Sequence, residues 1–413
     1  MLLLSHPTGN ANVRAAARAF HATGWLRELD SCLCWDPQAS VARLLPSSLA
    51  AQLARRSFAD MPLTLQHSHP WREILRLLSP ALPLLKAHER GPLSIDAVYR
   101  SFDRHVAARL NKLAGLQAVY AYEDGALSTF QSAERLGLRR LYDLPIGYWR
   151  AARAIFEEER DLQPAWACTL TGLQDSAAKL DRKDQELQLA DQVIVASAYV
   201  RSSLIGHQAC SAPIAVVPYG APPPLTELQP FRKSGPLRVL FVGSLGQRKG
   251  LSYAFEAVEM LGSQVSLTLI GTLTTSHCSP LNAGLVRHQW IPSLPHPQIL
   301  EQMRRHDVLL FPTLFDGFGL VMTEALSQGL PVIATANSGA PECIRDGVEG
   351  FIVPIRSSQA IAERLQQLAS NREQLAAMRQ ACLRRAAEMS WAGYEQALVA
   401  VVGQALSSAP SLP

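Results

Sequence analysis

Short apolar runs alternate with longer amphipathic segments along the whole chain. The short runs are rich in valine, isoleucine and leucine, as buried strands are, and the longer segments carry apolar residues at helical spacing. This alternation is typical of α/β proteins with parallel sheets covered by helices. A chain of 413 residues exceeds what one hydrophobic core usually organises, so we expect two such units facing each other across a cleft.

The second half of the chain shows the clearer pattern. It predicts helices at Leu251–Leu261, Gln298–Arg305 and Thr323–Gln328, separated by strands, which together describe one Rossmann-like unit. The predicted strands are Leu237–Gly243, Val265–Gly271, Asp307–Pro312, Pro331–Thr335 and Gly350–Pro354.

The first half is less regular but predicts a second Rossmann-like unit. Five prolines before Phe231 then exclude a helix or a central strand between Pro218 and Pro236. The predicted strands of this half are Met1–Ser5, Ala118–Tyr122, Arg139–Pro145, Val193–Ser197 and Ala215–Pro218.

These patterns give the expected organisation of the chain. Helices are predicted from about Gln359 to Met389 and from Trp391 to about Leu406, with frayed residues at the end. We expect an N-terminal unit at 1–220, a linker at 221–236, a C-terminal unit at 237–390 and a final helical segment at 391–413.

Charge is distributed unevenly. Residues 1–120 hold 14 Lys and Arg against 8 Asp and Glu, a net charge of +6, so the remainder carries −2. A basic front half suits an anionic partner other than nucleic acid.

The apolar runs are far shorter than the ~20 residues that span a bilayer, and the start lacks the features of a signal peptide. Seven scattered cysteines predict reduced thiols, and hence a cytoplasmic protein or one peripheral to the inner face of a membrane.

Two carboxylates, Asp316 and Glu324, flank a glycine-phenylalanine-glycine turn after a predicted strand. Ligands of doubly wound sheets bind at such strand ends. Gly317 and Gly319 allow a ligand to approach the backbone, and the helix expected from Leu320 directs its first amides at an anion. A carboxylate at Glu324 suits the vicinal hydroxyls of ribose. Taken alone, the motif also suits a structural turn and a solvated helix residue.

A second glycine-rich loop decides between these interpretations. Gly243 and Gly246 follow another predicted strand and precede Arg248 and Lys249, two cations that suit a pyrophosphate. Two exposed charges at a helix start would be the alternative, but both motifs together favour a nucleotide site.

These motifs resemble the donor domain of family 4 (group 1) glycosyltransferases, which are retaining enzymes of the GT-B fold. The resemblance is carried by VGSLGQRKG, LFDGFGLVMTEALSQGLPVIAT and IRDGVEGFIVP, and more loosely by SHPTGN and VVPYGAP in the front half. It implies that the segment from Trp391 crosses back onto the first unit. It also implies donor contacts by Gly243, Ser244, Arg248, Lys249, Gly317, Phe318, Gly319, Leu320 and Glu324, with Lys249, Asp316 and Glu324 as catalytic residues.

Two positions depart from the family pattern. Asp316 stands where the family usually has glutamate, and Ser244 stands where many members carry arginine, so Lys249 and Arg248 are left to hold the phosphates. The resemblance implies a nucleotide diphosphate sugar as donor, UDP- or GDP-linked, and no separate cofactor. The acceptor is expected to be a hydroxyl group on a saccharide or a lipid-linked molecule, in bacterial cell-surface polysaccharide or glycolipid assembly.

A metal-independent reaction is expected. The chain has no Asp-x-Asp motif, and His67 and His69 are expected to lack nearby acidic partners. Front-face transfer, in which the leaving phosphate helps to deprotonate the acceptor, is the expected mechanism.

Acceptor contacts are predicted on the first unit. His6 and Gly9 lie in the first loop, and Glu123 and Asp143 follow two predicted strands. A tight turn at Gly9 and helix or turn caps at the two acids are the alternatives. His105, in an amphipathic helix, is expected to have a packed or surface role.

Two segments carry weaker signals. Trp71–Arg90 mixes apolar and basic residues, and a helix pair packed on the first sheet is favoured over an amphipathic surface resting on anionic lipid. His288–Ile291 is expected to follow a strand and to read the nucleobase edge.

Two rival functions remain open at this point. A nucleotide-sugar epimerase of the same fold cleaves the same bond without an external acceptor. A noncatalytic nucleotide-sugar-binding partner of another transferase would be consistent with Asp316 and Ser244.

Overall fold

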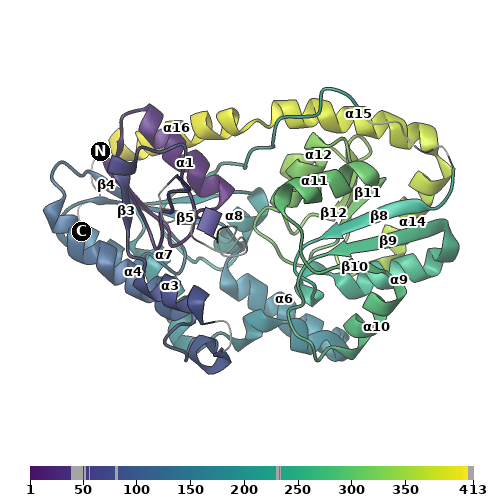
Figure 1. The fold of residues 1–413 in the computed structure, drawn as a ribbon, viewed down its shortest axis with the longest axis horizontal. Coiled ribbons are helices and arrows are strands. Elements are labelled where there is room, and N and C mark those ends of the chain that lie inside the picture. Colours follow the sequence, from purple (N-terminus) through teal and green to yellow (C-terminus); the bar gives the residue numbers. More distant parts are fainter. Residues whose placement is uncertain are drawn as a thin grey trace.

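A computed structural model describes residues 1–407 apart from 39–49, 51–52, 55, 80–81, 229–231 and 233. Figure 1 shows two units side by side, each a parallel sheet with helices on its faces. Part of the predicted linker, including Pro230 and Phe231, lies outside the described residues, as do residues 408–413 of the predicted frayed end.

The sheet of the first unit has the strand order β3-β2-β1-β4-β5-β6-β7, and every pairing is parallel. All five strands predicted for this half are confirmed, with ends that differ by at most two residues, whereas β2 and β3 were not predicted. The bounds are β1 (Leu2–Ser5), β2 (Leu26–Ser31), β3 (Gln66–Ser68), β4 (Ala118–Tyr122), β5 (Arg139–Leu144), β6 (Gln192–Val195) and β7 (Ile214–Val216).

The sheet of the second unit has the order β10-β9-β8-β11-β12-β13 and is also parallel throughout. Its five predicted strands are confirmed. His288–Ile291 come after β9 and α10 in the chain, but Gln289–Ile291 themselves form the edge strand β10, which was not predicted; the nucleobase contact stays a prediction. The bounds are β8 (Leu237–Val242), β9 (Val265–Ile270), β10 (Gln289–Ile291), β11 (Val308–Phe311), β12 (Val332–Thr335) and β13 (Gly350–Val353).

The α-helices up to α13 lie between the strands, as the crossovers of parallel sheets require, and the last three follow β13. Their bounds are α1 (Ala11–Ala22), α3 (Trp71–Leu78), α4 (Ile95–Arg109), α5 (Leu127–Arg135), α6 (Trp149–Leu162), α7 (Ala177–Leu189), α8 (Ala198–Ile205), α9 (Leu251–Leu261), α10 (Ser279–Arg287), α11 (His296–Arg305), α12 (Leu320–Ser327), α13 (Ala340–Cys343), α14 (Ser358–Ser370), α15 (Arg372–Glu388) and α16 (Trp391–Ser407). Short 3-10 helices are η2 (Leu63–Leu65), η3 (Pro83–Lys86), η4 (Leu110–Lys112), η5 (Pro164–Thr169), η6 (Thr171–Gln174), η7 (Gln247–Lys249) and η8 (Gly262–Gln264).

The central strands are apolar on both sides because helices cover both faces of each sheet. Every residue of β1, β4, β11 and β12 is buried. The loops that follow these strands all emerge at the carboxyl edge of their sheet, which is where doubly wound folds bind ligands.

The last helix returns from the second unit to the first. In Figure 1 the yellow helices α15 and α16 run along the top of the view, and α16 lies beside α1. Arg18 of α1 forms an ion pair with Glu395 of α16 at 2.8 Å. Ala221 pairs with Ser390 in an isolated bridge at the point where the chain leaves the first unit. The two segments of the chain that cross between the units therefore lie side by side.

Among the described residues, no helix combines the length and the apolar character that crossing a bilayer requires.

Candidate functional site

The glycine-rich loop after β8 folds back onto the end of β11. Gly250 has a φ of +69°, and a Cβ atom there would lie 1.9 Å from the carbonyl oxygen of Pro312. Only glycine fits a left-handed position this close to another backbone. The carbonyl of Arg248 accepts hydrogen bonds from the Leu314 amide at 2.9 Å and from the Thr313 hydroxyl at 3.1 Å. The two predicted motifs are therefore adjacent.

Asp316 contacts both cations of the glycine-rich loop. Lys249 Nζ donates to Asp316 Oδ2, and Arg248 Nη1 lies 3.4 Å from the same oxygen. Burial raises the pKa of Asp316, but the Lys249 ammonium and the Arg248 guanidinium outweigh burial and hold that pKa below its usual value. The carboxylate is therefore ionised at neutral pH and offsets one of the two positive charges.

Helix α12 begins directly after the turn that follows Asp316. Gly319 precedes it with a φ of +90°, and no side chain caps the helix start. The first amides of α12 are thus available to an anion. Glu324 lies one turn further along, and its Oε1 is 2.9 Å from Nε2 of His296 at the start of α11. This hydrogen bond raises the pKa of His296.

One cavity of about 660 Å³ lies between the two units and is lined by residues of both. The first unit contributes the start of α1, which, like α12, has no side-chain cap. Two helix starts and the Lys249 ammonium thus face one space, which is an arrangement that binds anions. The cavity is lined from the first unit by Gly9, Asn10, Ala11 and Asn12 and from the second by Gly243, Lys249, Asp316, Phe318, Gly319 and Leu320, among others.

A smaller cavity of about 220 Å³ lies next to the first and is lined by Ser244, Arg248 and Lys249. The predicted donor residues therefore divide between two neighbouring cavities that share Lys249. Glu324 and Gly317 line neither of them.

Gly317 lies against the first unit and has no open space beside it. A Cβ atom at Gly317 would be 1.8 Å from the carbonyl oxygen of Pro145. The Gly317 carbonyl also accepts a hydrogen bond from the Ser197 hydroxyl at 2.6 Å. Any side chain at this position would therefore clash with Pro145, and the donor contact predicted for Gly317 stays a prediction.

Of the predicted acceptor residues in the first loop, only Gly9 lines the large cavity. His6 is buried, its ring meets Tyr122 edge-on at 4.6 Å, and its Nδ1 accepts from the Thr8 amide at 2.9 Å. Burial lowers the pKa of His6 to about 4. His6 is therefore a neutral, packed residue beneath the loop.

The two predicted acids of the first unit, the buried Asp143 and the half-buried Glu123, line neither of these cavities. Burial raises the pKa of Asp143 to about 7, and Tyr120 donates a hydrogen bond to it at 2.7 Å. Burial also raises the pKa of Glu123 to about 7, and the Lys183 ammonium lies 3.1 Å from it. Neither acid lines a cavity that contains Lys249.

Several residues at the site were not predicted. Asn12 lines the large cavity and donates a hydrogen bond to the Tyr219 hydroxyl at 3.2 Å, and Arg14 lines the same cavity one turn into α1. His296 contacts Glu324. Asn12 and Arg14 could have been predicted, because they are a polar residue and a cation just after the SHPTGN loop. No sequence pattern pointed to His296.

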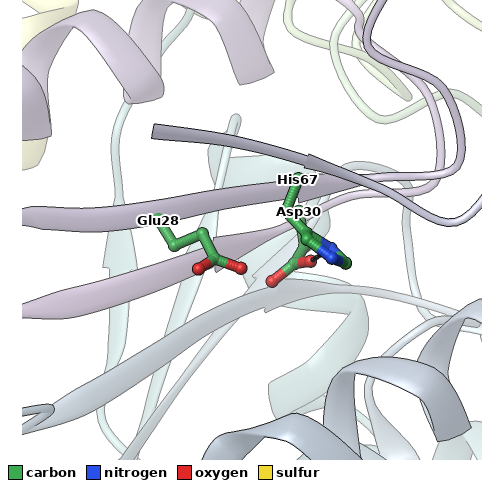
Figure 2. A group of neighbouring side chains, drawn as sticks. All are labelled: Glu28, Asp30 and His67. Atoms are coloured by element: carbon green, nitrogen blue, oxygen red, sulfur yellow. Dashed lines mark hydrogen bonds and ion pairs between the residues drawn. The ribbon is translucent and has the colours of Figure 1, made fainter. Parts of the chain in front are cut away.

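The expectation that His67 has no acidic partner is wrong. Strands β2 and β3 pair with Asp30 opposite His67, and Nδ1 of His67 lies 2.7 Å from Oδ1 of Asp30. Figure 2 shows Glu28, Asp30 and His67 together, close enough for one ion to contact all three. The Arg109 guanidinium already lies 2.6 Å from Glu28 and 2.7 Å from Asp30. A side-chain cation thus occupies the position that a metal ion would need.

His105 is packed, as one of its two expected roles requires. Its ring stacks on His69 at 4.0 Å and on His67 at 5.4 Å. Burial and the neighbouring imidazoles lower the pKa of His105 to about 4.

Comparison with known families identifies the second unit. The profile described as "Glycosyl transferases group 1" matches residues 227–385, which include the glycine-rich loop, the acid pair and α12. The second unit is therefore similar to the group 1 glycosyl transferases. Family 4 within that group stays a prediction.

Two relatives illustrate the extent of the similarity to the group 1 proteins. A D-inositol 3-phosphate glycosyltransferase of Corynebacterium aurimucosum is 26% identical over 295 residues, which is 65% of this chain and 68% of that protein. The amylovoran biosynthesis glycosyltransferase AmsK of Erwinia amylovora is 31% identical over 140 residues, which is 31% of this chain and 34% of that protein. Several other matches also span only about a third of the relative.

Solved structures confirm the fold over the whole chain. Sucrose-phosphate synthase from Thermosynechococcus elongatus has a TM-score of 0.70 at 17% identity and covers 99% of both chains. Anabaena Alr3699/HepE, solved in complex with UDP and glucose, has a TM-score of 0.64 at 16% identity and covers 98% of this chain and 99% of its own. The predicted GT-B architecture, with two Rossmann-like units, is confirmed.

Proposed function

We propose that this protein is a glycosyltransferase that moves a sugar from a nucleotide diphosphate donor to a hydroxyl acceptor. One observation carries the proposal: the uncapped starts of α1 and α12 and the Lys249 ammonium line a single cavity between the units. The similarity to the group 1 glycosyl transferases, which covers Lys249 and α12, supports it.

The donor diphosphate would take the place of Asp316 as the partner of Lys249. Breaking the bond between the anomeric carbon and the diphosphate builds negative charge on the leaving oxygen. Positive groups fixed at that oxygen lower the barrier, and they act most strongly in a site with little water. Lys249 is buried, and the first amides of α12 need no rearrangement to help it.

Asp316, once released from Lys249, would orient hydroxyls of the donor sugar. The Asp316 side chain is 15% exposed and lines the large cavity. Glu324 would accept hydrogen bonds from the ribose hydroxyls on the side of α12 that faces His296.

We propose front-face transfer with retention and without a metal ion. The leaving phosphate would help to deprotonate the acceptor, because no free carboxylate apart from Asp316 lines the large cavity among the described residues. Mass spectrometry during turnover that detected a sugar covalently attached to a side chain would contradict this mechanism.

The donor and the setting are proposals by analogy. A UDP-linked donor is supported by UDP in the structure of HepE, and a GDP-linked donor remains the alternative. Cell-surface polysaccharide assembly is supported by the name of the relative AmsK.

A thermal-shift panel of UDP, GDP and ADP with their sugars tests the binding step. A ligand that binds only the folded state raises the free energy of unfolding by mass action, by about 2.7 kcal/mol at 100 times its Kd. The melting temperature rises with it. We expect one nucleoside diphosphate to stabilise the wild type and to lose that effect in Lys249→Ala. A panel in which none raises the melting temperature would contradict the proposal.

Product analysis separates the proposal from its rivals. A transferase consumes the stabilising nucleotide sugar only in the presence of a hydroxyl acceptor, apart from slow hydrolysis. An epimerase converts the donor without any acceptor, and a noncatalytic binding partner leaves it unchanged under both conditions.

A further inference from the structure

The helix α3, the turn η3 and the start of α4 expose apolar side chains on the first unit. Leu78 is 60% exposed, Leu84 is 85% exposed and Ile95 is 58% exposed. This corrects the favoured expectation that Trp71–Arg90 packs its leucines on the first sheet. The exposed side chains of this apolar surface are Trp71, Ile74, Leu75, Leu78, Leu82, Leu84 and Ile95.

Hydrogen bonds join the three segments that form the apolar surface. The Leu93 amide, just before α4, donates to the carbonyl of Leu85 in η3 at 2.8 Å. Arg72 Nη1, in the first turn of α3, donates to the Pro92 carbonyl at 2.6 Å. The exposed apolar residues therefore belong to one connected region of the first unit, and in Figure 1 α3 lies beside α4.

A hollow of about 430 Å³ next to Pro92 is lined by four arginines and by no acidic residue. Arg100 and Arg104, both exposed on α4, donate to backbone carbonyls only. Arg182 is paired with Asp103 at 2.7 Å. The arginines of this hollow, which we call the arginine hollow, are Arg72, Arg100, Arg104 and Arg182.

Three of these guanidinium groups lack a counter-charge within the part of the chain that the structure describes. No carboxylate there forms an ion pair with Arg72, Arg100 or Arg104, and Nε of Arg72 is buried without a hydrogen-bond partner. Three acids lie in the neighbouring hollow: Asp96 is 3.1 Å from Lys179, Asp124 is 3.6 Å from Lys183, and Glu89 accepts hydrogen bonds from Ser176. The arginine hollow therefore carries an excess of positive charge.

We propose that the arginine hollow binds the phosphate of an anionic phospholipid headgroup while the apolar surface rests in the outer part of the same lipid layer. Guanidinium groups suit phosphate oxygens because they donate paired hydrogen bonds. A free phosphate ion would explain the arginines but not the exposed leucines beside them. A lipid surface explains both, because apolar burial and attraction to anionic headgroups act together there.

Vesicle flotation at fixed ionic strength tests this site. The full chain is mixed with vesicles of phosphatidylcholine containing 30% phosphatidylglycerol, or of phosphatidylcholine alone. We expect the wild type to float only with the anionic vesicles. The double variant Arg100→Glu/Arg104→Glu should bind them at least 30-fold more weakly, since each lost arginine removes about 1 kcal/mol.

A matched control has the same change in net charge elsewhere on the first unit. Arg27 and Arg201 are exposed and line none of these cavities, so Arg27→Glu/Arg201→Glu should keep binding within about threefold of wild type. Equal losses in the two double variants would show general basicity and overturn the specific site. Thermal unfolding of both variants checks that they are folded.

Two further measurements separate the lipid from other sources of phosphate. Leu78→Ser/Leu84→Ser should weaken flotation at least tenfold, because both side chains are exposed on the apolar surface. Inorganic phosphate that stabilised the protein against heat through Arg100 and Arg104, without any flotation, would overturn the lipid proposal. Equal flotation with neutral and anionic vesicles would overturn it as well.

Discussion

Lys249 is the residue on which most of the proposed chemistry depends. It is buried, contacts Asp316 and lies 4.6 Å from the centre of the Phe311 ring, so its ammonium has little freedom. We predict that Lys249→Ala lowers kcat on the order of 100- to 1000-fold, which corresponds to about 2.7–4 kcal/mol of lost transition-state stabilisation. Steady-state kinetics with the nucleotide sugar identified by thermal shift measure the change.

Arg305→Ala provides the control for Lys249, because Arg305 is an exposed cation of the same unit and its partner Glu301 is also partly exposed. Its kcat should stay within about twofold of wild type, since surface ion pairs contribute little. A Lys249→Ala variant with normal kcat and a normal melting temperature would contradict the assigned role.

Asp143 predicts a pH dependence of stability. Burial raises its pKa from 3.8 to about 7, so the folded state binds a proton more tightly than the unfolded state does. The stabilisation is complete below pH 3.8 and is lost as the pH rises through about 7. Between pH 5 and 8 the free energy of unfolding of the wild type should fall by roughly 2–3 kcal/mol relative to that of Asp143→Asn. The asparagine side chain does not titrate in this range.

Denaturant unfolding of wild type and Asp143→Asn at pH 5 and pH 8 measures this difference. The amide oxygen of asparagine can still accept the hydrogen bond from Tyr120. Parallel pH profiles for the two proteins would show that Asp143 is ionised in the folded state at both values.

Individual side-chain pairs were the hardest feature to predict from the sequence. Residue types and their spacing predicted that Lys249 and Asp316 share a site, because both follow strands of one sheet. The partnership of Asp30 with His67 was missed because 37 positions separate them and only the register of β2 on β3 places them opposite each other. The pairing of His296 with Glu324 depends in the same way on how α11 lies against α12.

At the scale of elements, the apolar strands were predicted, whereas the polar β2 and the short β3 and β10 were not. β4 reads AVYAY and is buried at every position, so its composition identifies it. β2 reads LRELDS, β3 has 3 residues at the edge of the first sheet, and β10 has 3 residues at the edge of the second. Edge strands bury less surface and so carry a weaker pattern.

The contact between the linker and α16 predicts the effect of one glycine. A Cβ atom at Gly220 would lie 2.6 Å from both N and Cα of Trp391. Backbone cannot move aside as a flexible side chain can, so Gly220→Ala should lower the free energy of unfolding by about 1–3 kcal/mol. Denaturant unfolding of the whole chain measures the loss.

Gly393 in the first turn of α16 is the matched control. The nearest atom to a Cβ there is the Ser390 hydroxyl at 3.6 Å, so Gly393→Ala meets no obstacle. Alanine favours a helix over glycine by about 1 kcal/mol, and this variant should be as stable as wild type or more so. Equal destabilisation by both alanines would contradict the packing of Gly220 on Trp391.

At the scale of the molecule, the candidate site exists only where the two units meet. The sequence predicted two Rossmann-like units and the motifs of the second, because those motifs are local. It did not predict that Asn12 and Arg14 line the same cavity as Lys249 or that Pro145 lies against Gly317. Such contacts depend on how two sheets are oriented, and no local pattern encodes that orientation.

A crystal structure with the nucleoside diphosphate that most raises the melting temperature tests the central claim most directly. The account predicts the diphosphate between Lys249 Nζ and the first amides of α12, with Asp316 released from Lys249 and with Glu324 hydrogen-bonded to the ribose. A nucleotide bound elsewhere, with Lys249 still paired to Asp316 and Glu324 still paired only to His296, would contradict it.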